Sequence, residues 1–427
     1  MWINLKEKMR EPNAYKSEYS ALLDGALNDS LALCKEPRQD WNLDVKRVSV
    51  ILTSSRGGSS LLKEVLSKSN NFVSLPGEEE PYYIMTKNLF PFGSESDEVS
   101  HLKNKEAILK LMYNDLGVPV NNMNLNKISR DWQRRLIYQF PDGRFPHVDT
   151  LVKNCYGTSD TYEEGTKLFL RALHGYKAGY YDISDTNSDY VEQFKIEEPP
   201  YVVPGNKRPL TTSDLSEKTL LFKTPQDYCR PGIFEYLFPN AEVKYIHLTR
   251  GWAQSTNGLM DGWLSDTGFF AYNVDCVEGF KLNIKGYSDV KRFGDKWWKF
   301  DLFPGWHHYT DTTLAKVCAN QWLHAHQFIM KHFPDDVLRI KFETFLTDKQ
   351  GVTDRICNYL GIDKIVVDDL PQVMITEKPK MFRWHKRKDE LMTIWNQIGI
   401  RPNTGFGALL RNTMLQLGYS KDPETWI

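Results

Sequence analysis

The 427-residue sequence lacks the features that mark membrane-spanning and disulfide-bonded proteins. No stretch approaches the roughly 20 apolar residues that a membrane-spanning helix needs, and the amino terminus has no apolar block of the signal-peptide kind. The six cysteines are scattered without a CxxC spacing, which is typical of reduced thiols rather than of a disulfide framework or a zinc site. We therefore expect a soluble, cytoplasmic protein that holds no metal.

An excess of charge of either sign is also missing. The chain has 54 Lys and Arg residues against 55 Asp and Glu residues, for a net charge of −1. This balance provides no overall field for nucleic acid or an anionic membrane, so any anionic ligand must be held by a local cluster of cations. Aromatic residues are plentiful, with 22 Phe, 21 Tyr and 12 Trp, and they fit either a large core or a ligand cleft. Composition leaves the oligomeric state open.

Four short apolar runs, rich in β-branched residues and bounded by turn signals, predict buried strands. They cover residues 48–53, 219–223, 243–249 and 337–342. Apolar residues at helical spacing follow the first and the last run, and Gly361 is expected to end the last helix. A repeated strand–turn–helix order predicts an α/β fold with a parallel sheet flanked by helices.

Two segments differ in character from this pattern. Residues 94–216 mix polar helical patches with turns and are expected to form a large insertion, either a lid or a substrate subdomain. Residues 262–309 are rich in aromatics and are expected to lie on the substrate side as well. The core of a single domain over residues 1–427 would then come from 46–93, 217–261 and 310–427.

The first predicted strand runs into a glycine turn and a helix, which makes an anion site. Backbone N–H groups and the positive end of the helix dipole meet there. Gly57 and Gly58 allow close approach to the anion, and Arg56 offers a forked cation. The Walker pattern is absent because no lysine precedes the two serines that follow. The full loop reads Thr53-Ser54-Ser55-Arg56-Gly57-Gly58-Ser59-Ser60.

This P-loop-like turn resembles the arginine type of the donor loop in sulfotransferases that use 3′-phosphoadenosine 5′-phosphosulfate (PAPS). Three later segments resemble further motifs of that family in the same order: 245–255, 340–362 and 381–386. The resemblance implies that the loop binds the 5′-phosphosulfate, that Arg250 binds the 3′-phosphate, and that a basic tryptophan segment closes over the nucleotide. The implied donor-binding residues are Ser55, Arg56, Gly57, Gly58, Ser59, Ser60, Arg250, Gly258, Arg383 and Trp384.

The chain departs from the family pattern at two places. Gly258 stands where the family usually has a serine, eight residues after the arginine that binds the 3′-phosphate. Ser255, Thr256 or Asn257 could replace that serine through a local shift. Phe382 stands where a serine often precedes the basic tryptophan pair. The basic residues that follow that pair (386–388) could either meet the 3′-phosphate or form a solvated helix face.

Sulfuryl transfer needs a cation at the moving group and a base for the acceptor proton. Arg56 is the natural cation. Lys223, at the end of a predicted strand, resembles a lysine of protein-tyrosine sulfotransferases, and Glu79 resembles their base within a Gly-Glu-Glu run. Glu78 is the nearest rival, and a solvated acidic turn is the structural alternative. The histidines considered as alternative bases are His174, His307 and His308; His324 and His326 lie about 200° apart around a helix, too far to share a metal.

The sequence therefore favours an enzyme that moves a sulfuryl group from PAPS to a hydroxyl of an acceptor, with a carbohydrate or a secondary metabolite preferred. The alternatives are a P-loop-like ATP-dependent phosphotransferase and a catalytically silent nucleotide-binding scaffold of the same fold. The first is weakened by the missing Walker lysine. The second is weakened by the presence of Arg56, Lys223 and Arg250.

Overall fold

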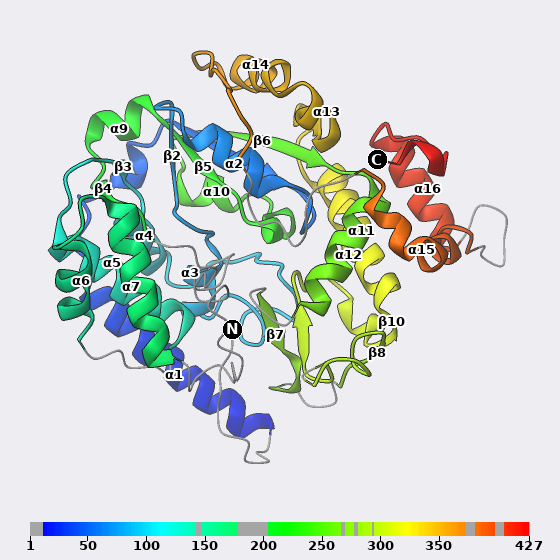
Figure 1. The fold of residues 1–427 in the computed structure, drawn as a ribbon, viewed down its shortest axis with the longest axis horizontal. Helices are drawn as coiled ribbons and strands as arrows, with labels where there is room; N and C mark the ends of the chain where they lie inside the picture. Colours follow the sequence, from blue (N-terminus) through cyan, green and yellow to red (C-terminus); the bar gives the residue numbers. More distant parts are fainter. Residues whose placement is uncertain are drawn as a thin grey trace.

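The computed structural model describes residues 12–141, 147–177, 204–265, 270–276, 281–292, 294–371, 381–397 and 405–426. Its main sheet has five strands in the order β11-β6-β1-β5-β2, and Figure 1 labels β2, β5 and β6 among them. The strands are β1 Arg47–Leu52, β2 Phe72–Ser74, β5 Thr219–Phe222, β6 Glu242–Thr249 and β11 Leu338–Lys341. The four strands predicted from the sequence are confirmed. The fifth, β2, was missed because it is only three residues long.

All neighbouring strands of this sheet run parallel, which confirms the predicted fold class. The central strand β1 pairs with β5 on one side, where Val48 lies opposite Leu220, and with β6 on the other, where Val48 lies opposite Val243. The carboxyl ends of parallel strands share one edge, the edge at which open α/β sheets bind ligands. The loop 53–60, Lys223 and Arg250 each follow directly after a strand at this edge.

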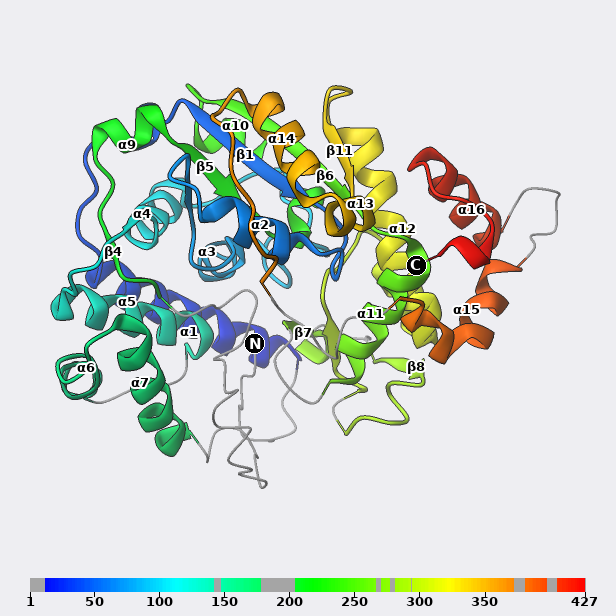
Figure 2. The ribbon, with the colours of Figure 1, turned by 45° about the horizontal axis from the view of Figure 1, so that its top comes forward.

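Helices cover both faces of the sheet because successive strand residues point to opposite sides. Ile51, Leu221 and Ile246 pack in one cluster with residues of α2 (Ser59–Ser67), α13 (Phe342–Thr347) and α14 (Lys349–Leu360), which are grouped in Figure 2. Val50 and Phe222 belong to the larger cluster with α10 (Ile233–Leu237) and α12 (Leu314–His332). Gly361 ends α14 in the left-handed conformation (φ 66°), as predicted.

Within the predicted insertion, three helices form a small unit with its own core. They are α5 Leu125–Gln139, α6 Val148–Tyr156 and α7 Tyr162–Lys177, and Trp132 and Phe169 pack between them. In Figure 1 this unit lies on the opposite side of the sheet from α15 (Lys388–Trp395) and α16 (Phe406–Gln416). The described residues of the predicted insertion also form α4 Lys105–Asp115, β3 Val118–Pro119, β4 Lys207–Arg208 and α9 Thr212–Glu217.

A buried carboxylate ties this unit to the element that follows the Gly-Glu-Glu run, α3 (Glu80–Met85). Asp115 accepts hydrogen bonds from Tyr82 of α3 at 3.0 Å and from Tyr138 of α5 at 2.9 Å. Arg134 of α5 pairs with the same carboxylate at 2.6 Å and holds its pKa below the usual range, against the effect of burial. Helices α3, α4 and α5 are therefore joined by charge-assisted hydrogen bonds to one carboxylate.

The aromatic segment packs as core in the part that the structure describes. Trp263, Trp298 and Trp306 are at most 1% exposed, and the ring of Trp298 lies 5.2 Å from each of the other two. Edge contacts of this kind stabilise aromatic clusters, so these rings pack against one another rather than line an open cleft. The segment contains the end of α11 (Trp252–Leu264), β7 Ala271–Asn273, η3 Val274–Cys276, β8 Asn283–Lys285, β9 Trp297–Lys299 and η4 Trp306–Tyr309, followed by β10 Asp311–Thr313.

The remaining elements are α1 Pro12–Ala32, η1 Trp41–Leu43, η2 Pro225–Cys229, η5 Arg383–Arg387 and η6 Pro423–Thr425. The cysteines at 34, 155, 229, 318 and 357 are free thiols. None of the helices in the described ranges is both long enough and apolar enough to cross a bilayer.

Candidate active site

The loop between β1 and α2 closes so tightly that glycine is required at two of its positions. A Cβ at Gly57 would lie 2.1 Å from Thr53 Oγ1, and one at Gly58 would lie 2.3 Å from the ring of Phe342. Gly58 also has a φ of +96°, which L-residues rarely adopt. Arg56 itself sits in the left-handed region with a φ of 63°. The glycines therefore permit a tight turn that leads into the amino terminus of α2, as the anion-site interpretation requires.

Buried hydroxyls without partners surround this loop. Thr53 and Ser54 on the loop, and Ser255 and Thr256 on α11, are each at most 1% exposed. No described residue forms a hydrogen bond with any of these four hydroxyls. Buried polar groups are normally satisfied, so a set of orphan hydroxyls at one strand edge is suited to a polar ligand. A Cβ at Gly258, one turn further along α11, would meet only Arg56 Cβ at 3.6 Å, so the expected serine position has room beside the loop.

Two arginines meet at the loop. Arg250 Nη1 donates to the backbone carbonyl of Arg56 at 3.1 Å, and its guanidinium lies 5.1 Å from the centre of the Phe342 ring. Burial, followed by the repulsion from Arg250, lowers the pKa of Arg56 to about 10. Burial also lowers the pKa of Arg250, although the Glu343 carboxylate opposes that effect. Arg56 is still cationic at neutral pH, and two partly buried guanidiniums of the same sign favour an anion between or beside them.

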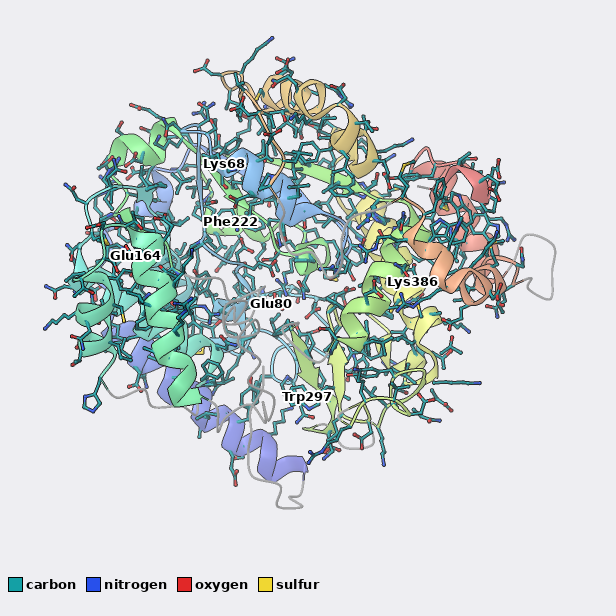
Figure 3. All side chains as sticks on the ribbon, viewed as in Figure 1. Lys68, Glu80, Glu164, Phe222, Trp297 and Lys386 are labelled. Atoms are coloured by element: carbon teal, nitrogen blue, oxygen red, sulfur yellow. The ribbon has the colours of Figure 1, made fainter. Side chains whose placement is uncertain are left out.

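A single carboxylate on α11 holds three cations of the predicted closing segment. Asp261 pairs with Lys386 at 2.8 Å, with Arg387 at 2.7 Å and with Arg383 at 3.0 Å. Figure 3 labels Lys386, which lies beside α11. Arg387 also donates to the backbone carbonyl of Asn257 at 3.3 Å. Asp261 and Arg383 act electrostatically on Arg56, so this ion-pair cluster and the loop form one charged region.

Replacing Asp261 by alanine is expected to lower the free energy of unfolding by about 2–4 kcal/mol, because it removes the carboxylate that pairs with two partly buried guanidiniums, those of Arg383 and Arg387. Urea denaturation would measure this loss. A matched control is Asp275→Ala, since Asp275 is 3.9 Å from Lys296 in an exposed pair. Exposed pairs contribute little, so the control should change stability by less than about 1 kcal/mol. Equal losses in the two variants would contradict the role of Asp261 as the centre of the cluster.

The Gly-Glu-Glu run lies against the end of β5. Lys223 Nζ pairs with Glu78 Oε1, and the Thr224 hydroxyl donates to Glu79 Oε2. Lys63, from α2, donates to the carbonyl of Gly77 at 2.6 Å and approaches the same carboxylates. Burial raises the pKa of both glutamates, while Lys223 opposes this effect at Glu78 and Thr224 opposes it at Glu79. The pKa of Lys63 is lowered to about 8, mainly by burial and secondly by the charge on Lys223.

A second buried cluster lies directly behind these glutamates. Tyr272 Oη is within hydrogen-bonding distance of Glu80 Oε1, at 2.8 Å, and of Asp97 Oδ1. The hydroxyl has only one proton to donate, so one of the two carboxyls must donate in return. Glu80 pairs with Arg230 at 2.8 Å, whereas burial, reinforced by Glu80, raises the pKa of Asp97 well above its usual range. The shared proton is therefore assigned to Asp97. Glu80 is labelled near the middle of the molecule in Figure 3.

Trp384 lies in the core. It is fully buried, and its Nε1 donates to the backbone carbonyl of Trp426 at 2.7 Å. Its ring packs 5.5 Å from the ring of Trp426, which in turn contacts Trp252 and Trp395. In this arrangement Trp384 anchors η5 to the body of the protein, and the neighbouring basic residues are the ones that face Asp261.

The histidines considered as alternative bases are engaged elsewhere or not described. His307 and His308 lie in η4 with their rings 4.1 Å apart. His326 Nδ1 is 2.8 Å from His247 Nε2 in the core. His324 stacks on Phe303 at 5.3 Å, so both histidines of α12 pack against neighbouring rings. The side chain of His174 lies outside the described residues. No group of three potential metal ligands occurs in the described ranges.

Four residues of this region were missed by sequence reasoning: Lys63, Thr224, Asp261 and Asp301. Asp301, fully buried, accepts a hydrogen bond from Tyr228 at 2.8 Å, and burial raises its pKa to about 6 although Tyr228 and the nearby Ser55 hydroxyl oppose the shift. Thr224 could have been found from its position next to Lys223 at a strand end. The other three carry no local signal, because their importance comes from partners distant in the sequence.

Comparisons with known proteins assign no family to the chain. No protein-family model matches the chain, and no curated protein matches it. One similar solved structure is the sulfotransferase domain from the curacin biosynthetic pathway, which is 14% identical with a TM-score of 0.35 over 88% of this chain and 99% of that one. Another is the sulfotransferase domain from the Synechococcus PCC 7002 olefin synthase, which is 13% identical with a TM-score of 0.35 over 91% of this chain and 100% of that one.

Proposed function

We propose that this protein is a sulfotransferase that moves a sulfuryl group from PAPS to a hydroxyl of an acceptor. One observation carries the proposal. The glycine loop with Arg56 and Arg250 lies at the same sheet edge as a buried pair of glutamates held by Lys223 and Thr224. This edge therefore combines cations for an anionic donor with carboxylates for an acceptor proton, the two requirements of sulfuryl transfer.

The residues at the loop fit the anionic donor. The orphan hydroxyls of Thr53, Ser54, Ser255 and Thr256 can donate to phosphate or sulfate oxygens. We assign the 5′-phosphosulfate to residues 55–60 and the 3′-phosphate to Arg250 with the segment around Arg383. The donor supplies an activated sulfuryl group. The protein binds it, orients it and balances its charge through Arg56. No metal is needed for these roles.

The glutamates and Lys223 act on the acceptor hydroxyl in this proposal. Glu79 is the base in this proposal, because one of its carboxylate oxygens, Oε1, has no partner among the described residues. Lys223 pairs with Glu78 and so keeps a cation at the carboxyl edge of the sheet. We assign residues 94–216 and 262–309 to the acceptor side of a single domain. A carbohydrate or a secondary metabolite is the preferred acceptor class.

Calorimetry with adenosine 3′,5′-bisphosphate, the desulfated product, tests the donor assignment. We expect saturable binding that weakens as salt rises, because Arg56, Arg250 and the cations around Asp261 contribute charge. Adenosine 5′-diphosphate is the matched control, since it lacks the 3′-phosphate and should bind more weakly. Absence of bisphosphate binding at millimolar concentration would contradict the proposed function. Magnesium-dependent ATP consumption would favour a phosphotransferase, and bisphosphate binding without transfer to any acceptor would favour a silent scaffold.

A further inference from the structure

Thr224 makes two hydrogen bonds to one glutamate. Its Oγ1 accepts from the backbone N–H of Glu79 at 3.1 Å, and its hydroxyl donates to Glu79 Oε2. Both residues are 0% exposed, so water does not compete for either bond. A hydroxyl that holds both the main chain and the carboxylate of the same residue restricts the rotation of that side chain.

The two oxygens of Glu79 are therefore not equivalent. Oε2 is held by Thr224, whereas Oε1 is buried and has no hydrogen-bond partner among the residues that the structure describes. The neighbouring carboxylate of Glu78 is instead paired with Lys223. Lys223 and Thr224, which follow β5, thus give the two glutamates different environments. Glu78 forms an ion pair, whereas Glu79 is an oriented carboxylate with one oxygen that has no hydrogen-bond partner among the described residues.

Thr224 is itself held in place. Its backbone N–H donates to Asp227 Oδ2 at 3.1 Å, and Pro225 begins the short helix η2 immediately after it. Arg230, at the end of η2, lies 3.4 Å from Asp227 Oδ1 and 2.8 Å from Glu80. The hydroxyl is therefore presented by a rigid turn, as a residue that orients another side chain requires.

We propose that Thr224 is a positioning residue that holds Glu79 with Oε1 directed at the acceptor hydroxyl. The inference rests on the proposed sulfuryl transfer. In that step the acceptor O–H proton passes to Glu79 Oε1 and the acceptor oxygen forms the new O–S bond. The S–O bond to the donor phosphate breaks, and its electron pair leaves with the nucleotide. Thr224 touches neither substrate; it acts through Glu79.

The surroundings of Glu79 define the expected pH effect. The hydrogen bond from Thr224 stabilises the ionised carboxylate and so opposes the effect of burial, which raises the pKa of Glu79. Removing the hydroxyl should raise this pKa further, and the acidic limb of the rate profile should move to higher pH. The titratable groups that face Glu79 from the packed elements are Lys63, Glu78, Tyr82, Tyr83, Lys223, Asp227 and Arg230.

The test compares Thr224→Val, which removes the hydroxyl at nearly constant volume, with Thr224→Ser, which keeps it. We expect Thr224→Val to lower kcat by about 10–100-fold and to displace the acidic limb upward, with the affinity for adenosine 3′,5′-bisphosphate unchanged. Thr224→Ser should restore both the rate and the pH profile. Thr219→Val is the matched control, because Thr219 is buried on β5, the strand that precedes Thr224, and its hydroxyl has no partner within the described ranges.

Wild-type kcat and an unchanged pH profile in Thr224→Val would overturn the positioning role. If that variant does not fold, Thr224→Cys keeps the volume with a weak donor, and an unmoved acidic limb in it would overturn the role equally. The proposed function is judged separately, by bisphosphate binding and transfer in the wild type. If binding and transfer both fail, infrared titration of the Glu79 carboxyl, with Glu79→Gln as the reference, still tests the role of Thr224. A higher pKa of Glu79 in Thr224→Val than in the wild type supports positioning, and an unchanged pKa refutes it.

Discussion

Replacing Arg56 by alanine is expected to lower kcat/KM for sulfuryl transfer by about 10³-fold or more, the range found when a charge-stabilising group is removed from a transferring centre. Arg56 is the cation at the head of the loop, and its backbone is already in the left-handed conformation. The substitution therefore adds no new backbone strain, and it relieves the repulsion from Arg250 and Arg383, which together with the larger effect of burial lowers the pKa of Arg56. Folding should be preserved while turnover is lost.

Two variants sharpen this result. Arg56→Lys keeps the charge but loses the planar fork, so we expect activity between those of the wild type and the alanine variant. Arg208→Ala is the control for loss of an arginine, since Arg208 pairs with Asp214 away from the loop and its side chain is 42% exposed. Steady-state kinetics and thermal unfolding would be measured for all three. An alanine variant within threefold of wild-type kcat/KM would remove Arg56 from the proposed mechanism.

Replacing Glu79 by glutamine is expected to lower kcat by about 10²–10⁴-fold, the usual contribution of a general base. The amide oxygen can still accept the hydrogen bond from Thr224, so the local structure should be retained. Because the donor loop is untouched, binding of adenosine 3′,5′-bisphosphate should be unchanged. The loss should therefore appear in kcat rather than in donor affinity.

Glu78→Gln is the companion variant. It breaks the ion pair with Lys223 but leaves Glu79 and its partner in place, so its loss of kcat should be smaller. The opposite order, a large loss in Glu78→Gln and a small one in Glu79→Gln, would assign the base to Glu78. Normal kcat in both variants would return the role to a histidine.

Local patterns were sufficient for the fold class. β-branched runs of at least four residues predicted four of the five strands of the main sheet, and the helical spacing after them predicted α2 and α14 with its Gly361 end. These signals are local, because the periodicity of a strand or a helix can be recognised within a few consecutive residues. The strand β2, three residues long, carries too few residues for any period.

The aromatic residues show what composition cannot predict, namely whether a ring is buried in the core or lines a cleft. The aromatic composition of the chain is consistent with a cleft or with core, since both environments favour large apolar side chains, and the segment 262–309 was expected on the substrate side. The structure buries Trp263, Trp298 and Trp306 against one another. Trp384 likewise packs on Trp426. Burial is a property of the whole fold, and no local pattern reports it.

By itself, the sequence determined the glycine loop, its arginine and its place between a strand and a helix, because one continuous segment builds that site. The tertiary structure alone decided how the glutamates are used. Glu78 and Glu79 meet Lys223 and Thr224 across a separation of 145 residues in the chain. Three cations of η5 likewise converge on Asp261 from more than a hundred residues away. The glutamate contacts depend on the parallel pairing of β2 and β5, which brings distant carboxyl ends to one edge.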